Sequence, residues 1–239
     1  MKVRLQKILS RSGIGSRRTC EEYILAGRVL VNHEVATLGM KADPDCDLIQ
    51  FDGVTLQARP EPVYLVFNKP AGVLSSLVSQ GGKPTVLSHI EINQRVFPVG
   101  RLDLESEGLM LLTDDGELTH ILTHPRYKHE KEYRLLLDRT PTEKDLGRWR
   151  NGLTLRDGFK TSPAKVWVEK VEEQGTWVGT VLHEGHKRQL REIAAELRYG
   201  VRRLIRVRFG PLTLGDLAPG KWRMLTTQEI NQLRASAQV

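Results

Sequence analysis

The chain has 239 residues, of which 39% are hydrophobic and 27% are charged, so it is long enough for two globular domains with packed cores. No run of residues approaches the roughly 18 apolar positions of a membrane span, and the N-terminus has no signal-peptide pattern. The two cysteines do not form a Cys-x-x-Cys pair, which argues against a zinc site or a disulfide scaffold and favours the reducing cytoplasm. The formal net charge of +7 favours a polyanionic partner, nucleic acid first, and no membrane.

The positive charge is concentrated in two parts of the sequence. Residues 1–28 hold seven Lys or Arg against two Glu, and residues 183–210 hold eight against three acidic residues. Residues 29–60 are acidic by contrast. Two separated basic clusters indicate two contact surfaces for one long polyanion.

The first segment reads as two helices followed by a small hairpin. Apolar residues at helical spacing predict a helix near residues 3–12, and Ser16 is the expected N-cap of a second helix that ends near Ala26. The pattern of residues 28–36 predicts two short strands joined by a turn at Asn32-His33. The pattern of residues 47–53 predicts a further strand and turn. Pro60 and Pro62 mark a linker over residues 56–62.

Basic side chains surround the apolar stripe of these helices. Scattered charge is usually a solvated helix face, but here no acidic residue precedes Glu21. An unbalanced basic face beside a helix start can hold phosphates by charge and by free backbone N–H groups. Aromatic residues are scarce, so we expect phosphate and shape recognition of folded RNA. The expected RNA-binding residues are Lys2, Arg4, Lys7, Arg11, Ser16, Arg17, Arg18 and Arg28.

From Val63 onward the sequence is rich in strand patterns. A strand over residues 63–69 stops at Pro70, and a buried strand near 109–113 ends at an expected Asp-Gly turn, Asp115-Gly116. Helices are expected over residues 116–124 and over 187–200, the second closed by Gly200. Strands with partial alternation follow at 131–138, 164–171, 176–185 and 201–215. This pattern predicts an α+β domain dominated by antiparallel sheet.

The stretch "PVGRLDLESEG", residues 98–108, places Asp103, Glu105 and Glu107 at every second position. On an extended strand the three carboxylates would share one face, which fits a metal site, an acid/base pair or a solvated polar surface. No His-x-His pair lies nearby to support a metal site, and none is predicted. Spacing alone does not rank the three carboxylates.

Motifs along the chain resemble known RNA-modifying enzymes. The stretch "RLQKILSRSGIGSRRTCEEYILAGRVLVN" resembles the S4 RNA-binding domain. Further on come "FNKPAGVLSS", "RVFPVGRLDLESEGLMLLTDDGEL", "HEKEYRL", "HEGHKRQLREI" and "RLIRVRFGPL". In this order they resemble the RsuA/RluB/RluE/RluF group of ribosomal RNA pseudouridine synthases, nearest to its RluB-like branch.

The resemblance implies a role for several residues. Asp103 matches the catalytic carboxylate, which acts as nucleophile at the sugar or as base at C2′, and both roles stay open. Tyr133 matches the aromatic residue that stacks on the target uracil, and Arg191 matches the basic residue that pairs with the catalytic Asp. Arg101 is expected to help displace the base from its stack. Lys69 is expected either to bind substrate through RNA phosphate or to be a cation at the end of its strand, while Glu105 and Glu107 become supporting residues.

One position departs from the family pattern. Glu192 stands where members of the group commonly carry a second Arg after the one matched by Arg191. The catalytic pairing is unaffected, and RNA contacts near Glu192 are left open.

The resemblance also implies the architecture and the substrate. We expect an S4 domain over residues 1–58, followed by a catalytic domain over 63–235 with a mainly antiparallel mixed sheet flanked by helices. The expected protein is a monomeric cytoplasmic isomerase that needs no cofactor and acts on 23S rRNA, free or in an assembling large subunit. The alternatives are a 16S rRNA enzyme, a non-catalytic ribosome-assembly factor and a metal-dependent ribonuclease.

Overall fold

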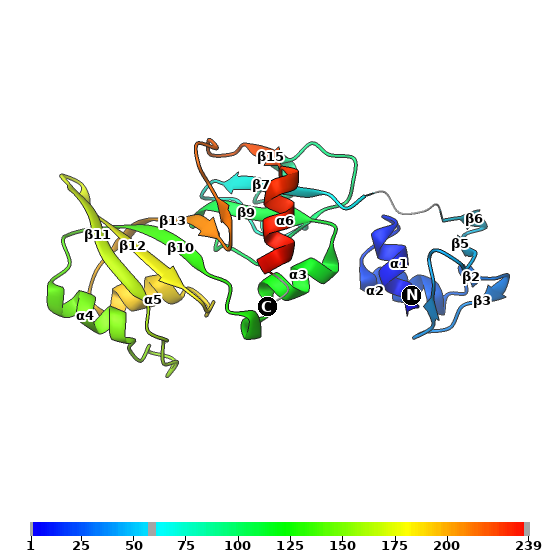
Figure 1. Cartoon of the computed structure of the whole chain (residues 1–239), viewed down its shortest axis with the longest axis horizontal. Helices are drawn as coiled ribbons and strands as arrows, with labels where there is room; N and C mark the ends of the chain where they lie inside the picture. The colour runs from blue at the N-terminus through cyan, green and yellow to red at the C-terminus, as the bar shows by residue number, and fades with distance from the viewer. Residues whose placement is uncertain (1, 57–60, 237–239) are drawn as a thin grey trace. The chain divides into compact units, whose positions relative to one another are not determined.

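The computed structural model describes residues 2–56 and 61–236 and divides after Pro62 into two compact units (Figure 1). Within the described residues, no helix combines the length and the apolar character that crossing a membrane requires. The predicted linker over 56–62 and the expected domain end at residue 58 fall largely on residues 57–60, outside the described ranges.

The first unit contains the predicted helices and hairpin. Helices α1 (Leu5–Arg11) and α2 (Arg17–Leu25) pack on a sheet of order β3-β2-β5-β6. Ser16 caps α2 as predicted, because its hydroxyl accepts the Thr19 N–H at 3.0 Å. The strands are β1 (Val3–Arg4), β2 (Val29–Val31), β3 (Glu34–Val35), β4 (Lys41–Ala42), β5 (Ile49–Phe51) and β6 (Val54–Thr55).

The hairpin turn of this unit also confirms its prediction. Asn32 and His33 both have positive φ angles, 52° and 70°, which a two-residue turn between right-twisted strands requires. The Asn32 side chain stabilises the turn further, because its carbonyl oxygen accepts the Leu48 N–H at 2.9 Å.

The second unit is built on one long sheet of order β11-β12-β10-β13-β9-β7-β15, with β8 and β14 paired at its side. All of its described strand pairs are antiparallel except β9 with β13, which confirms the predicted α+β class. The strands are β7 (Tyr64–Lys69), β8 (Phe97–Pro98), β9 (Glu107–Thr113), β10 (Lys131–Leu137), β11 (Lys165–Glu172), β12 (Gly175–Leu182), β13 (Val201–Phe209), β14 (Leu212–Thr213) and β15 (Trp222–Met224).

Helices cover the two halves of this sheet separately (Figure 1). Helices α4 (Glu143–Asn151) and α5 (Gln189–Glu196) share a core with β10, β11 and β12. Helices α3 (Gly116–Thr123) and α6 (Thr227–Ser236) share another core with β7 and β9. Two single-turn 3-10 helices, Val86–His89 and Pro125–Tyr127, complete the unit.

Two local predictions are corrected. Asp115 is not part of a simple turn: its carboxylate caps α3 by accepting the backbone N–H groups of Glu117 and Leu118, both at 3.1 Å. Helix α5 ends before Gly200, because Arg198 takes the left-handed conformation with φ +65°, and the N–H groups of Arg198 and Tyr199 bond back to the last turn.

The parallel pair of β9 and β13 joins the two halves of the sheet. Ile205 pairs with Glu107 and Arg206 pairs with Gly108. Gly108 has a φ of +104°, and a Cβ there would lie 2.3 Å from the Arg206 carbonyl oxygen. Only glycine permits this approach. The junction also brings the loop before β9, which contains Asp103, next to strand β10, which carries Tyr133.

Lys69 lies at the end of β7 and is fully buried. Its ammonium group donates to the carbonyl oxygens of Pro70 at 3.0 Å, Leu104 at 3.3 Å and Ser106 at 2.7 Å. The structure contradicts the contact with RNA phosphate, because all three N–H donors of the ammonium group are bound to carbonyl oxygens. It agrees with the other alternative, a cation at the end of the strand. Lys69 instead fixes the loop that carries Asp103.

We expect Gly108→Ala to lower the free energy of unfolding by about 3 kcal/mol, since the new methyl group adds backbone strain to a steric clash. Gly147→Ala is the matched control. Gly147 lies within helix α4, and a Cβ added there would meet no atom of a neighbouring element within 4 Å, so this variant should gain about 1 kcal/mol. Urea unfolding of both variants measures the difference, and an unchanged Gly108→Ala would contradict the close approach.

Lys69 should make the free energy of unfolding depend on pH in the alkaline range. Burial lowers its pKa from 10.5 to about 8, and the carboxylates of Glu107 and Asp103 offset only part of this effect. Between these two pH values the unfolded chain binds more protons than the folded chain, so the free energy of unfolding rises with pH. The full rise from this one group is about 3 kcal/mol.

Unfolding titrations at pH 8 to 10.5 test this dependence. Lys69→Met should lose the contribution, whereas Lys83→Met, which removes an exposed lysine, should keep it. Equal pH slopes for Lys69→Met and the wild type would show that Lys69 keeps its ordinary pKa when folded.

Candidate active site

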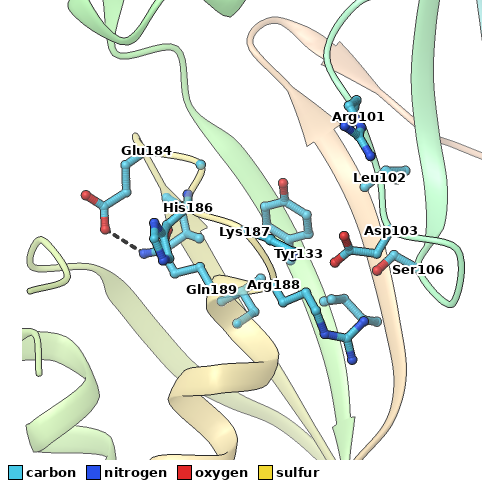
Figure 2. Close-up of a pocket in the computed structure, with 14 residues that line it drawn as sticks. Arg101, Leu102, Asp103, Ser106, Tyr133, Glu184, His186, Lys187, Arg188 and Gln189 are labelled. Atoms are coloured by element: carbon cyan, nitrogen blue, oxygen red, sulfur yellow. Dashed lines mark hydrogen bonds between the residues drawn. The ribbon is translucent and has the colours of Figure 1, made fainter. Parts of the chain in front are cut away.

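A cleft in the second unit consists of two adjoining cavities of about 560 and 980 Å³. Arg101, Tyr133 and residues 184–186 line both cavities. Asp103 and Ser106 line the smaller one, which Figure 2 shows. The fold thus brings Arg101, Asp103 and Tyr133 to the same cavity. Each cavity has the size of a site for a small molecule or one nucleotide.

The backbone around Asp103 is held from two sides. Lys69 binds the carbonyl oxygens of Leu104 and Ser106. On the other side, the Ser75 hydroxyl donates to the Leu102 carbonyl at 2.6 Å and accepts the Leu102 N–H at 3.0 Å. Fixed in this way, the loop directs the Asp103 carboxylate towards the Tyr133 ring (Figure 2).

The three alternating carboxylates have different partners. Glu105 forms ion pairs with Arg188 at 3.2 Å and Arg191 at 3.7 Å. Glu107 accepts two hydrogen bonds from Arg203, at 3.0 and 2.8 Å.

Asp103, by contrast, has no side-chain hydrogen bond or ion pair among the residues that the structure describes. The three therefore do not converge on one metal, and Asp103 is the carboxylate left available to a substrate in the cavity.

Tyr133 lies on β10 between Thr180 of β12 and Arg206 of β13. Its ring packs against the hydrophobic cores of both halves of the sheet. The remaining part of the side chain lines the cleft, with the hydroxyl directed into it (Figure 2). A ring held this firmly offers a flat surface to a planar base.

Arg191 extends from α5 and is mostly enclosed, with 13% of its side chain exposed. It donates to the carbonyl oxygens of Val201 at 3.3 Å and Glu105 at 3.2 Å. Burial lowers the pKa of Arg191, and the carboxylates of Glu105 and Asp103 oppose this shift.

The expected direct ion pair between Arg191 and Asp103 is absent from the described structure. The Glu105 carboxylate, two residues after Asp103, takes that place. Asp103 therefore interacts with Arg191 through the electric field rather than by contact. Arg101 follows Gly100, whose φ is +74°, and stays exposed beside both cavities.

The larger cavity has a basic lining that the sequence did not predict residue by residue. Arg206 is 2% exposed, and its Nε donates to the Leu109 carbonyl at 2.8 Å, while its Nη2 is buried without a partner among the described atoms. Lys131 lies nearby, and burial together with Arg206 lowers its pKa. The sequence signals for Arg206 were the basic cluster at residues 183–210 and its place within the motif "RLIRVRFGPL", and neither gave it a role.

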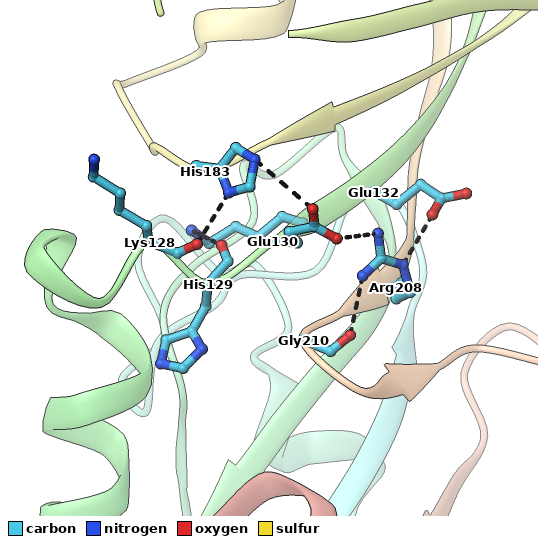
Figure 3. A network of polar contacts seen from close by, with 8 residues as sticks. Lys128, His129, Glu130, Glu132, His183, Arg208 and Gly210 are labelled. Carbon is cyan, nitrogen blue, oxygen red and sulfur yellow. Dashed lines mark hydrogen bonds and ion pairs between the residues drawn. The ribbon is translucent and has the colours of Figure 1, made fainter. Parts of the chain in front are cut away.

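A polar network holds the segment that carries these cations (Figure 3). Arg208 donates to Glu130 and Glu132, both at 2.9 Å, and to the Gly210 carbonyl at 3.2 Å. His183 Nδ1 lies 3.0 Å from the Lys128 carbonyl oxygen. Lys128, His129, Lys131 and His183 therefore have fixed places around the larger cavity.

The basic residues expected to bind RNA lie in the first unit. Lys2, Arg4, Lys7, Arg17, Arg18 and Arg28 are exposed, and Arg11 is half-buried. Two have structural partners: Arg4 donates to the Gly39 carbonyl at 2.8 Å, and Arg28 pairs with Asp52 and lies over the rings of Tyr23 and Phe51. The Ser16 hydroxyl is used by the cap.

Comparison with known proteins agrees with this geometry. Residues 63–196 match the family described as RNA pseudouridylate synthase, and residues 3–47 match the S4 domain. An uncharacterized RNA pseudouridine synthase of Aquifex aeolicus (strain VF5) is 41% identical over 236 residues, which cover 98% of this chain and 94% of the relative. The ribosomal large subunit pseudouridine synthase B of Bacillus subtilis (strain 168) is 37% identical over 238 residues, covering 98% and 96%.

A solved structure, described as the crystal structure of pseudouridylate synthase, shares the fold. It superposes with a TM-score of 0.66 at 29% identity and covers 97% of this chain and 99% of its own. The expected resemblance is thereby confirmed: the chain belongs to the RNA pseudouridylate synthase family and carries an N-terminal S4 domain.

Proposed function

We propose that this protein converts a uridine of large-subunit ribosomal RNA to pseudouridine, with Asp103 as the catalytic carboxylate. The observation that supports this most is the Asp103 carboxylate, which has no partner among the described residues and faces Tyr133 across a cavity of nucleotide size. The large subunit is favoured because the Bacillus subtilis relative is named for it.

Isomerisation of uridine to pseudouridine can be carried out by a carboxylate together with an aromatic side chain that holds the base. The bond between uracil N1 and ribose C1′ breaks, and a bond between C5 and C1′ forms. The C5 proton is lost, and N1 gains a proton, so nothing is oxidised and no group is added. A carboxylate can attack C1′ or remove the C2′ proton.

The other residues of the cleft have distinct proposed roles. Tyr133 stacks on the extruded uracil and accepts the C5 proton late in the reaction. Arg101, exposed at the cleft, enters the space that the base leaves in the RNA. Arg191 is a positioning residue, because its positive charge attracts the Asp103 carboxylate and helps to orient it. Lys69 positions the Asp103 loop from behind.

In this proposal the first part of the chain binds RNA and the second part carries out the reaction. An S4 domain over residues 1–58 binds phosphates of folded rRNA through Lys2, Arg4, Lys7, Arg11, Arg17, Arg18, Arg28 and the helix start at Ser16. A catalytic domain over residues 63–235 carries the cleft. We propose that the protein acts as a monomer in the cytoplasm, on free rRNA or on an assembling large subunit.

Asp103→Asn should abolish isomerisation, since the amide is neither a nucleophile nor a base. We expect tritium release from rRNA labelled at uracil C5 to fall by at least about 1,000-fold, with RNA affinity nearly unchanged. Asp216→Asn, which changes an exposed Asp after β14, is the matched control. Full activity of Asp103→Asn would contradict the catalytic role.

Tritium release and the integrity of the RNA, followed together, distinguish the proposed enzyme from an assembly factor and from a ribonuclease. A wild-type protein that binds rRNA but releases no tritium would be an assembly factor. Cleavage of the RNA that stops in EDTA would indicate a metal-dependent ribonuclease.

Pseudouridine mapping should identify the target. In cells without this protein, one pseudouridine should disappear from 23S rRNA, and a plasmid encoding the wild type should restore it while one encoding Asp103→Asn should not. Loss of a pseudouridine from 16S rRNA instead would overturn the assignment to the large subunit.

A further inference from the structure

His186 is fixed in the wall of the cleft by two contacts of its ring and one of its backbone. It stacks on the Phe159 ring with centroids 4.1 Å apart and planes 4° apart. Its Nε2 lies 2.6 Å from an Asp157 carboxylate oxygen, and its backbone N–H donates to the Gln189 side chain at 3.1 Å. None of these residues has a part in the proposed chemistry.

The His186 ring nevertheless remains available to a ligand. Its side chain is 28% exposed, and the residue lines both cavities. Phe159 covers one face of the ring and lines the larger cavity. A rigid, partly exposed aromatic pair in a cleft is the arrangement that proteins use to stack an unpaired nucleic-acid base, because ordering the ring at binding costs little entropy.

The larger cavity also contains an unsatisfied cation. Arg206 is 2% exposed and lines this cavity, and its Nη2 is buried without a partner in the described structure. The Lys131 side chain lines the same space. A buried guanidinium without an ion-pair partner among the described residues attracts an anion, so its charge adds to that of Lys131 in favouring the phosphate of an RNA strand. The cavity thus offers both a stacking surface and an anion partner.

We infer that the larger cavity is a second nucleotide subsite, which takes the unpaired nucleotide directly next to the target uridine. Its base stacks on the partly exposed ring of His186, which Phe159 supports, and its phosphate contacts Lys131 in the electric field of Arg206. The smaller cavity, with Asp103, holds the target uridine itself. The substrate class is therefore an RNA in which two consecutive nucleotides leave the helix. This inference rests on the proposed function.

Fluorescence of a modified RNA tests the subsite directly. The probe is a short hairpin that carries the mapped uridine, with 2-aminopurine in place of the nucleotide on its 5′ or its 3′ side. Bound to the Asp103→Asn protein, one of the two probes should be quenched by stacking, and His186→Ala in the same background should remove the quenching. Absence of protein-dependent quenching at both positions would overturn the inference.

Affinities of four variants define the role of the ring. His186→Ala should weaken hairpin binding about tenfold, and His186→Phe, which keeps the ring but not the proton, should bind within about twofold of the parent. His89→Ala is the matched control, because His89 also lies against a phenylalanine, Phe67, but lines neither cavity. Phe159→Leu should weaken binding less than His186→Ala, since it removes only the support.

An abasic nucleotide at the quenched position completes the test. The abasic hairpin should bind the wild-type protein more weakly than the intact hairpin, by the same factor as His186→Ala weakens binding of the intact hairpin. The two changes together should lower the affinity no more than either change alone. Additive effects of the two changes would overturn the inference. A His186→Phe protein that binds the hairpin normally but has lost activity would also overturn it, because His186 would then act as an acid or base in the reaction. Tritium release by the wild type on the unmodified hairpin tests the proposed function separately.

Discussion

The catalytic cleft depends on the close parallel approach of β9 and β13 at Gly108 and Arg206. This contact joins two half-sheets, each of which has its own core and its own helices. It places the loop before β9 beside β10, so that Asp103 and Tyr133 line the same cavity. The same contact explains the buried position of Arg206, whose guanidinium reaches the larger cavity. A side chain at position 108 would separate the halves and open the site.

Charge pairing then selects one carboxylate from three. Arginines at the start of α5, within α5 and on β13 pair with Glu105 and Glu107. The Asp103 carboxylate has no hydrogen bond or ion pair among the described residues. Lys69 and Ser75 hold its loop through backbone carbonyl and N–H groups. In the proposed reaction, a loop held in this way needs little reorganisation when charge develops on the sugar. Because Glu105 and Glu107 are paired with arginines, Asp103 is the proposed reactive carboxylate.

Local signals in the sequence were reliable where a short-range contact decides the structure. The Ser16 cap, the Asn32-His33 turn and the strand before Pro70 follow from neighbouring residues. The family motifs pointed to Asp103, which lines the smaller cavity, and its catalytic role stays a prediction. The sequence left two roles open for Lys69, because two of its three carbonyl partners, Leu104 and Ser106, lie 35 and 37 residues further along the chain. Helices α4 and α6 escaped prediction since they bury few side chains. The stack of His186 on Phe159 joins a helix start to a distant loop, and no sequence period encodes it.

The central claim is that the target uridine leaves the RNA and places its ribose at Asp103. The most direct measurement is a structure of the Asp103→Asn protein bound to a hairpin that carries the mapped uridine. We predict that the uracil stacks on Tyr133 and that ribose C1′ or C2′ lies within about 3.5 Å of the residue 103 side chain. A uridine that stays stacked in the RNA helix, or a ribose outside the cleft, would contradict this account.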